Sequence, residues 1–272
     1  QLLADPHFPN KLRVDKREDI RPCLLCNEEC VGRLNNRLTQ ISCAVNPSSG
    51  FETHFEITQL PVEQQVIVIG AGPGGLEAAR VAALRGCRVT LYDKADHIGG
   101  VFGDIATAPF KGRLRALVQW YERQLAQLGV HIVLQREIHV DDAELAAADA
   151  IFVATGSLPI IPNLPGLDDK RVIPVLEAHT QGVSGQKVVV WGGGLSGCDC
   201  ALELAMQGKE VTLVEMTKRW AADAPGTHRV SQRRCSAEHK VHIANNTRVC
   251  GVTADGVMIE QADGTSAVLE AD

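Results

Sequence analysis

The chain has 272 residues, of which 45% are apolar and 22% charged, and 33 acidic against 27 basic side chains give it a formal net charge of −6. This composition excludes disordered and fibrous classes, and the length predicts two globular domains at about 150 residues each. The mild acidity excludes general electrostatic binding of nucleic acid or of an anionic membrane, and no apolar stretch approaches the roughly 18 residues that a membrane-spanning helix needs.

The cysteine content and the N-terminal sequence bear on the compartment. Nine cysteines are an odd number, and their uneven spacing argues against a secreted disulfide scaffold. Residues 1–20 carry too many charges for a signal peptide. We therefore expect a cytoplasmic protein. Because the chain starts at Gln1 and stops at Asp272 directly after an apolar strand-like run, we also expect a fragment of a longer protein.

Four cysteines crowd the N-terminal part of the chain. They are Cys23, Cys26, Cys30 and Cys43. Thiolates at such spacing are typical ligands of zinc or of an iron-sulfur cluster. Structural zinc sites usually present two separated C-x2-4-C pairs, whereas here one pair is followed by a third cysteine nearby and a distant fourth. This pattern favours a [4Fe-4S] cluster, with zinc as the alternative. We interpret the five later cysteines as packing or surface residues.

Residues 66–93 form the first of two similar units. An apolar strand leads into a G-x-G-x-x-G turn at Gly70, Gly72 and Gly75, and an Ala-rich helix and a second strand ending at Asp93 follow. In such a unit the first glycine makes the tight turn, the second lets the backbone approach a pyrophosphate, and the third packs helix against strand. The acid at the end of the second strand can accept hydrogen bonds from a ribose.

Residues 188–215 repeat this pattern without a gap. Gly192, Gly194, Gly197 and Glu215 fall on the three glycines and the acid of the first unit at a constant offset of 122 residues. A lone G-x-G-x-x-G is weak evidence for nucleotide binding. Two copies, each with strand, helix and terminal acid in place, predict two dinucleotide-binding units.

The segments around the two units complete the predicted fold. We expect a helix over 110–128, strands over 130–134 and 151–154, a connector over 141–149 and a Pro-rich crossing over 159–166. Residues 217–240 read as a loop with a helix, and the tail as an antiparallel meander turning at residues 255–256 and 263–264. The prediction is an α/β protein with two Rossmann-like domains, an N-terminal cysteine-rich loop and a small antiparallel β meander.

The cysteine cluster and the two units together resemble a known family. Arg21-Pro22-Cys23-x-x-Cys26-Asn27, then Cys30, then Cys43-x-x-Asn46-Pro47 and the run from Gly70 to Arg80 are similar to the NADH:flavin oxidoreductases of the 2,4-dienoyl-CoA reductase and trimethylamine dehydrogenase type. The resemblance implies that this chain corresponds to the part of the full-length family members that follows an FMN-binding barrel. Residues 1–60 would be the barrel exit and [4Fe-4S] loop, 61–160 the FAD or ADP domain, and 161–272 an NAD(P)H domain truncated before its return to the FAD domain.

The resemblance also implies roles for individual residues. Gly70, Gly72 and Gly75 would hold the FAD pyrophosphate and Asp93 its ribose. Gly100, Thr155 and Gly156 would approach the same cofactor. The nicotinamide cofactor would bind at Gly192, Gly194, Gly197 and Glu215, and the cluster at Cys23, Cys26, Cys30 and Cys43. Glu215 would repel the 2′-phosphate of NADPH and favour NADH, while Lys218 and Arg219 could attract that phosphate instead. No catalytic residue is assigned, because the family's substrate-reducing residues belong to the barrel.

Three hypotheses of function follow. In the first, electrons pass from NAD(P)H through FAD and the [4Fe-4S] cluster to an FMN barrel that reduces an activated C=C bond, as in enoyl-CoA reduction. In the second, the first unit holds ADP as a structural ligand of an amine dehydrogenase, and electrons leave the cluster for an external carrier. In the third, zinc staples a nucleotide-binding protein without a redox role. The expected partners are the barrel and the nicotinamide cofactor, with a homo-oligomer left open and neither nucleic acid nor membrane expected.

Overall fold

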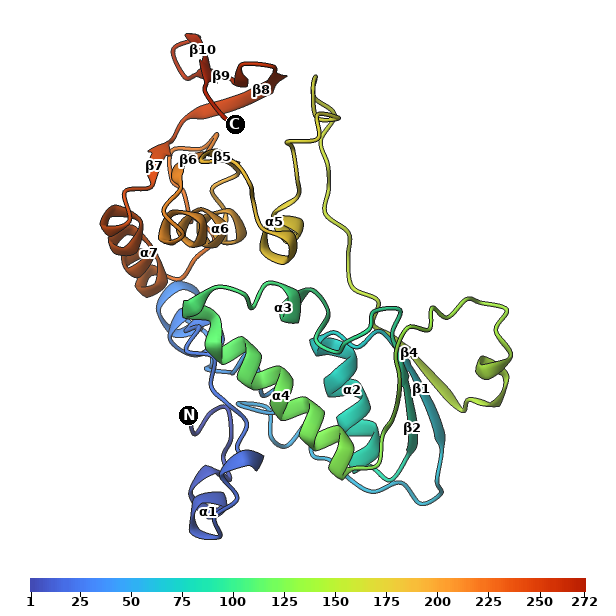
Figure 1. Cartoon of the computed structure of the whole chain (residues 1–272). Helices are drawn as coiled ribbons and strands as arrows, with labels where there is room; N and C mark the ends of the chain where they lie inside the picture. Colours follow the sequence, from blue (N-terminus) through green and yellow to red (C-terminus); the bar gives the residue numbers. More distant parts are fainter. The chain divides into compact units, whose positions relative to one another are not determined.

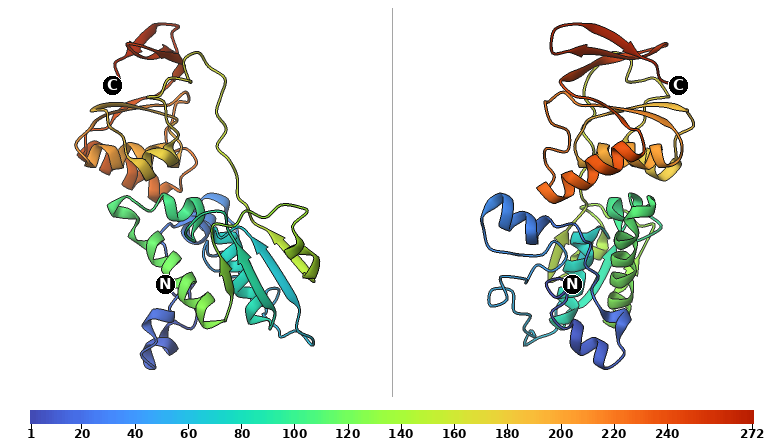
Figure 2. Two further views of the ribbon diagram at one scale, coloured as in Figure 1. Left: turned by 45° about the vertical axis from the view of Figure 1, so that its right-hand side comes forward. Right: turned by 90° about the vertical axis from the view of Figure 1, so that its left-hand side faces the viewer.

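The computed structural model describes residues 1–272, apart from the side chains of residues 36 and 37. The chain divides into two compact units, Gln1–Leu158 and Pro159–Asp272 (Figure 1). Each unit contains a parallel sheet with helices beside it, and Figure 2 shows each sheet from two further directions. The second unit also contains an antiparallel sheet, so the predicted α/β class with a small meander is confirmed.

The first unit is built on a four-stranded parallel sheet in the order β3-β2-β1-β4. Its strands are β1 (Gln65–Ile69), β2 (Arg88–Tyr92), β3 (His131–Val133) and β4 (Ala150–Val153). The β-branched residues of β1 favour a pleated, buried strand, and Val66 and Val68 lie in the core. Because the carboxyl ends of parallel strands meet at one edge, the segments that follow β1, β2 and β4 are neighbours there.

Two helices form the main cover of this sheet, α2 (Pro73–Leu84) and α4 (Gly112–Gln127). α2 packs on β1 and β2, and α4 packs against α2 (Figure 1). α4 buries Leu117, Trp120, Tyr121 and Leu125, the spacing of a helix with one face on a core, so the helix predicted over 110–128 is confirmed. The other helical segments are α1 (Phe8–Arg13), η1 (Arg17–Asp19), η2 (Glu28–Arg37), α3 (Gly100–Asp104), η3 (Pro109–Lys111) and η4 (Ala143–Ala147).

The second unit has a three-stranded parallel sheet in the order β5-β6-β7 and the antiparallel sheet β10-β9-β8. Its strands are β5 (Lys187–Trp191), β6 (Glu210–Val214), β7 (His242–Ala244), β8 (Thr247–Thr253), β9 (Gly256–Gln261) and β10 (Ser266–Leu269). Its helices are α5 (Val175–Gln181), α6 (Leu195–Met206) and α7 (Gly226–Glu238). α6 contributes most of its length to a buried cluster that includes Cys198 and Cys200, which places these two cysteines in packing positions.

The structure adds elements that the sequence pattern did not predict. Residues 28–37 form a wide helical segment where we expected a loop, and α5 and β7 were not expected at all. α5 has seven residues and β7 has three, too few for a periodic pattern to appear.

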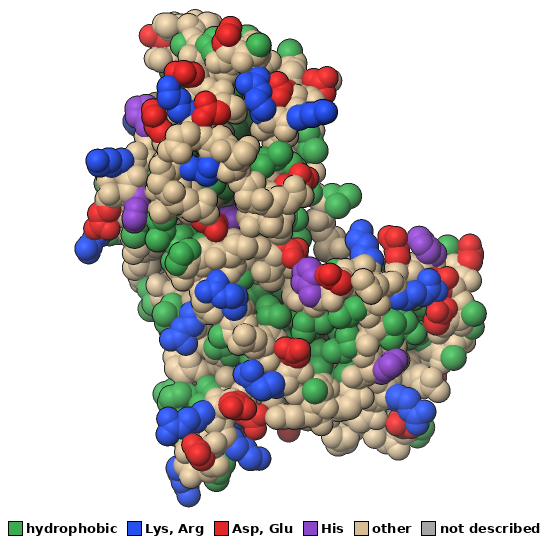
Figure 3. Space-filling model, viewed as in Figure 1, with side chains coloured by type: hydrophobic (Ala, Val, Ile, Leu, Met, Phe, Trp, Pro, Cys, Tyr) green, Lys and Arg blue, Asp and Glu red, His purple; other side chains and the backbone are tan. Residues whose placement is uncertain are grey.

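The surface carries both signs of charge in each unit. On the face shown in Figure 3, Lys and Arg side chains alternate with Asp and Glu, without a field of one sign. Among the described residues, none of the helices has the length and apolarity required to cross a membrane.

Candidate functional site: two glycine-rich turns and a cysteine loop

The first glycine-rich turn connects β1 to α2, and two of its glycines are required by the backbone itself. Gly70 has a φ of 104°, and a Cβ there would lie 2.3 Å from the carbonyl oxygen of Ala154. A Cβ on Gly75 would lie 1.8 Å from the carbonyl oxygen of Gly70, so only glycine lets α2 start this close to β1. These two glycines shape the turn whether or not a ligand is bound.

The middle glycine of the motif has a different role. A Cβ on Gly72 would meet no described atom within 4 Å, and its φ of −73° is open to any residue. Gly72 precedes Pro73, the first residue of α2, so the unpaired N–H groups of the helix N-terminus open onto this free space. A dinucleotide pyrophosphate needs such a bare backbone in front of a helix. The turn therefore fits the diphosphate of a dinucleotide.

Asp93 follows β2 and directs its carboxylate to the same turn. One oxygen, Oδ2, accepts a hydrogen bond from the N–H of Ala71 at 2.5 Å, and the other accepts one from the N–H of Ala95 at 2.8 Å. These two bonds hold the acid beside the turn. A half-buried acid in this position can accept hydrogen bonds from ribose hydroxyls.

The segment that starts α3 borders the turn on one side. The N–H of Gly99 donates to the carbonyl oxygen of Ala71 at 2.8 Å. A Cβ on Gly100 would lie 3.1 Å from the Cα of Gly72, and the φ of Gly100 is 53°. Residue 100 therefore lies against the middle glycine of the motif, where its backbone is close to any ligand in the free space.

The segment after β4 borders the turn on the other side. The N–H of Ala154 donates to the carbonyl oxygen of Ile69 at 2.7 Å. A Cβ on Gly70 would lie 3.1 Å from the backbone nitrogen of Thr155, and Gly156 follows in an exposed position. The structure thus brings together six of the residues predicted for the flavin, Gly70, Gly72, Gly75, Asp93, Gly100 and Thr155, and Gly156 is the next residue in the chain after Thr155.

The second glycine-rich turn, between β5 and α6, has the same construction. Gly192 has a φ of 105°, and a Cβ on Gly197 would lie 1.9 Å from the carbonyl oxygen of Gly192. Glu215 accepts a hydrogen bond from the N–H of Gly193 at 2.8 Å and another from the N–H of Thr217 at 2.7 Å. The four residues predicted for the nicotinamide cofactor, Gly192, Gly194, Gly197 and Glu215, therefore surround one turn.

The electrostatics of the second turn are set by Glu215. Burial acts to raise the pKa of this carboxyl, but the hydrogen bonds from Thr217 and Gly193 outweigh it and leave the pKa below its usual value. Glu215 is therefore ionised at neutral pH. Lys218 and Arg219 are exposed and follow Glu215 by three and four residues, so the negatively charged turn is followed closely in the chain by two positive charges.

One acidic residue at the second turn was missed by the sequence analysis. Oδ2 of Asp223 lies 3.3 Å from the backbone nitrogen of Leu195, the first residue of α6, and accepts its hydrogen bond. Asp223 belongs to the loop after β6, within residues 217–240, which we predicted as a loop with a helix. No spacing rule connects it to the glycine motif, because the loop conformation alone brings it there.

The four N-terminal cysteines are free and half-buried in the first unit. The N–H of Leu25 donates to Sγ of Cys23 at 3.4 Å, and the N–H of Glu28 donates to the thiol of Cys26. Amide donors of this kind stabilise a cysteine sulfur in its charged form and tune the potential of a cluster bound to it. The loop between Cys23 and Glu28 therefore places one amide donor at each of the first two cysteine sulfurs.

The third and fourth cysteines lie on neighbouring segments. The N–H of Ser42 donates to the carbonyl oxygen of Glu29 at 2.8 Å, which sets the segment of Cys43 beside that of Cys30. Burial raises the pKa of the Cys26 thiol, and negative charge on Cys30 and Cys43 adds to the rise. Within the part of the chain whose side chains are described, no three Cys, His, Asp or Glu residues are arranged to hold a metal ion, so the four-cysteine ligand set stays a prediction.

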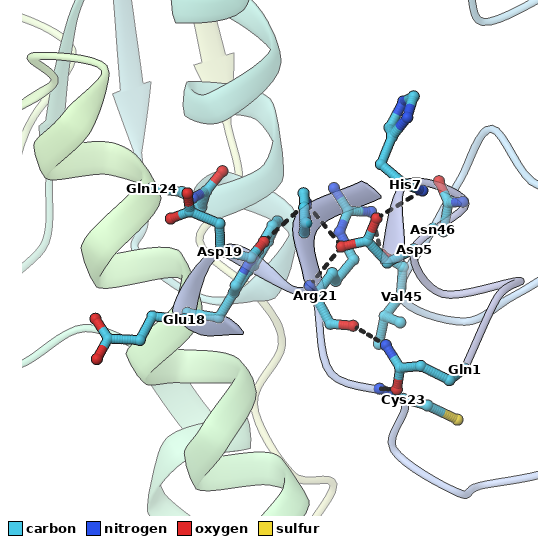
Figure 4. A network of polar contacts seen from close by, with 12 residues as sticks. Gln1, Asp5, His7, Glu18, Asp19, Arg21, Cys23, Val45, Asn46 and Gln124 are labelled. Atoms are coloured by element: carbon cyan, nitrogen blue, oxygen red, sulfur yellow. Dashed lines mark hydrogen bonds and ion pairs between the residues drawn. The ribbon is translucent and has the colours of Figure 1, made fainter. Parts of the chain in front are cut away.

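A network of polar contacts holds the start of the cysteine loop (Figure 4). Asp5 accepts hydrogen bonds from Nζ of Lys11 at 2.7 Å and from the backbone N–H of Arg21 at 2.8 Å. The side chain of Gln1 donates to the carbonyl oxygen of Arg21 at 2.7 Å and accepts from the N–H of Cys23 at 3.1 Å. The N-terminal segment thus fixes the backbone on which the first cysteine stands.

The guanidinium of Arg21 connects both arms of the loop to the sheet unit. It donates to the carbonyl oxygen of Val45, two residues after Cys43, and pairs with Glu77 of α2 at 3.3 Å. It also lies 4.6 Å above the ring of Trp120 on α4. The cysteine loop is therefore anchored to α2, the helix that begins at the first glycine-rich turn.

Two parallel sheets, each with a glycine-rich turn and a strand-end acid, define a class of protein: a dinucleotide-binding oxidoreductase fold. The family model described as pyridine nucleotide-disulphide oxidoreductase matches residues 64–272. The chain belongs to this family, and the two Rossmann-like domains predicted from the sequence are confirmed.

Individual relatives make the assignment more specific. The chain is 44% identical over 215 residues to a cinnamate reductase of Clostridium sporogenes, covering 79% of this chain and 32% of the relative. It is 31% identical over 287 residues to an N,N-dimethylglycine/sarcosine dehydrogenase of Chromohalobacter salexigens, covering 98% of this chain and 39% of the relative. The solved structure of a 2-naphthoyl-CoA reductase has a TM-score of 0.94 and 33% identity, covering 99% of this chain and 41% of that one.

These relatives confirm the resemblance to the reductase and amine dehydrogenase flavoproteins. By its family this chain is a pyridine nucleotide oxidoreductase domain, and the family and the relatives support FAD and a nicotinamide nucleotide as cofactors. It spans about a third to two fifths of the length of the relatives described.

Proposed function

We propose that the chain is the electron-transfer part of an iron-sulfur flavoprotein that passes electrons from NAD(P)H through FAD and a [4Fe-4S] cluster to an FMN-containing barrel. The observation that carries this proposal is the attachment of the cysteine loop to α2 through Arg21 and Glu77. Because α2 starts at the first glycine-rich turn, one rigid helix links the proposed flavin site to the proposed cluster site.

FAD when bound supplies the change from a two-electron hydride to the single electrons that an iron-sulfur cluster accepts. The residues of this chain would position that chemistry. Gly70 and Gly75 shape the turn, Gly72 leaves room for the pyrophosphate, and Asp93 accepts from the ribose. Cys23, Cys26, Cys30 and Cys43 would hold the cluster, with amide donors on the first two sulfurs.

The substrates named for two relatives indicate which reaction the whole protein carries out. Cinnamate and 2-naphthoyl-CoA both carry carbon–carbon double bonds conjugated to a carbonyl group, and each names the substrate of a relative. We therefore propose that the barrel reduces an activated, enoyl-CoA-like C=C bond. The nicotinamide cofactor would be NADH, because ionised Glu215 stands where the 2′-phosphate of NADPH would bring further negative charge.

A second candidate function has an observation in its favour. The similarity to a sarcosine dehydrogenase extends over 98% of the chain and supports an amine dehydrogenase in which ADP fills the first turn as a scaffold. The second turn argues against it, because a scaffold needs no nicotinamide site with its own glycine motif and fixed acid. The zinc alternative has no comparable support.

Flavin content of a Gly72→Val variant tests the FAD assignment. The side chain would enter space that is free without ligand, so we expect normal folding and loss of FAD. Gly226→Val is the matched control, because Gly226 likewise lies at a helix N-terminus, as the first residue of α7, and a Cβ on it also meets open space. Equal flavin content in both variants would show that the first turn does not bind FAD.

A further inference from the structure

The second glycine-rich turn carries an acidic side chain that comes from a later loop. Oδ2 of Asp223 accepts the hydrogen bond of the Leu195 N–H at 3.3 Å, and it lies 3.6 Å from the position of a Cβ on Gly194. Gly194 is the middle glycine of the motif and Leu195 begins α6. The carboxylate therefore lies at the helix N-terminus to which a dinucleotide pyrophosphate would bind.

Backbone hydrogen bonds and buried neighbours hold the loop that carries Asp223 in place. The N–H of Ala221 donates to the carbonyl oxygen of Gly193 at 2.6 Å, and the N–H of Ala224 donates to the carbonyl oxygen of Ala221 at 3.2 Å. Trp220, Ala221 and Ala224 are buried in the core of the second unit. Asp223 itself is exposed. The backbone is thus fixed on the turn, while the carboxylate can rotate into solvent.

The first turn has no such occupant. Among the described residues, no atom lies within 4 Å of a Cβ built on Gly72. The N–H of Gly99 makes the same backbone contact there that Ala221 makes in the second unit, 122 residues later. By the same spacing, Asp223 corresponds to Val101, which has no charge. The acid is therefore a feature of the second turn alone.

A pyrophosphate and a carboxylate compete for the same amide donors. Both are anions that accept hydrogen bonds from the first N–H groups of a helix, and two like charges a few ångströms apart repel. A bound dinucleotide must therefore displace Asp223. We propose that Asp223 is a built-in competitor that lowers the affinity of the second turn for the pyrophosphate of NAD(P)H and rotates away when the cofactor binds.

This inference deepens the proposed function and depends on it, since it assumes that the second turn binds the nicotinamide cofactor. Asp223 gives the N-terminus of α6 a hydrogen-bond acceptor while no cofactor is bound. It also weakens the hold on the oxidised cofactor after hydride transfer, which favours exchange for a fresh reduced one. The loop of residues 217–226 would then set how fast the cofactor turns over.

Binding of ADP-ribose, NADH and adenosine to an Asp223→Asn variant of this chain, measured by calorimetry, tests the proposal. ADP-ribose contains the pyrophosphate without the nicotinamide, and adenosine lacks both. The amide still accepts a hydrogen bond from Leu195 but has no charge, so we expect the dissociation constants of ADP-ribose and NADH to fall about tenfold. Adenosine binding should stay unchanged, because adenosine brings no charge to the turn.

Asp255→Asn is the matched control for net charge. Asp255 is an exposed acid in the turn between β8 and β9, and its variant should bind all three ligands as the unaltered chain does. A melting temperature of Asp223→Asn close to that of the control would show that the fold is intact.

The outcomes separate the inference from the function on which it depends. If the unaltered chain binds NADH and Asp223→Asn binds ADP-ribose equally or more weakly, Asp223 is a contact for the cofactor or a helix cap and the inference is wrong. If neither the unaltered chain nor either variant binds NADH or ADP-ribose, the proposed nicotinamide site is wrong, and the inference fails with it.

Discussion

The two glycine-rich turns of this chain have the same backbone and different surroundings. In each, the strand-end acid accepts from the N–H after the first glycine, Ala71 in the first unit and Gly193 in the second. In the first turn the space before the helix is free of side chains, whereas in the second it holds the carboxylate of Asp223. A repeated motif therefore specifies a shape, and the loops outside the motif decide how strongly each copy can bind.

The comparison also separates the glycines by function. Gly75 and Gly197 are needed for the turn to close, since a Cβ on either would lie within 2 Å of a carbonyl oxygen. Gly72 and Gly194 are free of backbone clashes. Gly75 and Gly197 are therefore required for folding, whereas Gly72 and Gly194 are required only where a ligand needs the space.

The largest expected effect is that of Gly75→Ala. The added methyl would meet the carbonyl oxygen of Gly70 at 1.8 Å and force α2 away from β1, which should cost about 3 kcal/mol or more of unfolding free energy. Gly72→Ala meets no described atom and should change stability by less than about 1 kcal/mol. Urea denaturation of both variants checks this pair, and equal destabilisation would contradict the division of roles.

The anchor of the cysteine loop comes next. Arg21→Met leaves the half-buried carboxylate of Glu77 with one partner fewer and removes the link to Val45, so we expect a loss of about 2–3 kcal/mol and a lower iron content. The exposed pair of Arg88 and Glu63 gives the control, Arg88→Met, with an effect below about 1 kcal/mol. Unchanged iron content in Arg21→Met would show that cluster binding does not depend on the contacts of Arg21.

The acid of the second turn should select the cofactor. Glu215→Gln removes the charge but keeps a hydrogen-bond acceptor for Gly193, and we expect the ratio of kcat/KM for NADPH to that for NADH to rise about tenfold. Steady-state kinetics with both cofactors and an artificial electron acceptor measures this ratio. The matching change in the first turn, Asp93→Asn, should leave it unaltered. An unchanged ratio in Glu215→Gln would show that Lys218 and Arg219 control the choice.

The smallest expected effect is a pH dependence of the first unit. Burial acts to raise the pKa of Glu77, but the hydrogen bond from Arg80 and the charges of Arg21 and Arg80 lower it below 4.5. A carboxyl with a lowered pKa stabilises the fold above its unfolded pKa, and this contribution disappears as the pH falls below about 4.5. Melting temperatures measured between pH 6 and pH 3.5 should therefore fall more steeply for the unaltered chain than for Glu77→Gln, and equal slopes would show that Glu77 is not the cause.

Most of the fold could be predicted from the sequence, because the two units carry strong local signals. Strands of β-branched residues, glycines with positive φ and Ala-rich helices act over a few neighbouring residues. The helix over residues 28–37 could not be predicted, since its sequence is polar and its conformation depends on contacts such as that of Ser42 with Glu29. β7 is too short for a pattern and is fixed by its pairing with β6.

The candidate site divides in the same way. The motif glycines and the strand-end acids were found by spacing alone, and the structure places them around one turn in each unit, while their contact with a cofactor stays a prediction. The contacts of Asp223 and Arg21 were not predicted. Asp223 reaches the second turn through the conformation of a loop, and Arg21 pairs with Glu77, which is 56 residues away in the chain. Long-range contacts of this kind leave no periodic trace in the sequence.

In the proposed function, one chain holds a flavin and an iron-sulfur cluster that NADH can reduce. An anaerobic ultraviolet-visible titration of the purified chain with NADH tests it most directly. We predict flavin bands on top of the broad absorption of a [4Fe-4S] cluster, with both bleached as NADH is added. A colourless protein that contains zinc, or a cluster spectrum that NADH leaves unchanged, would show that the chain is not this electron-transfer module.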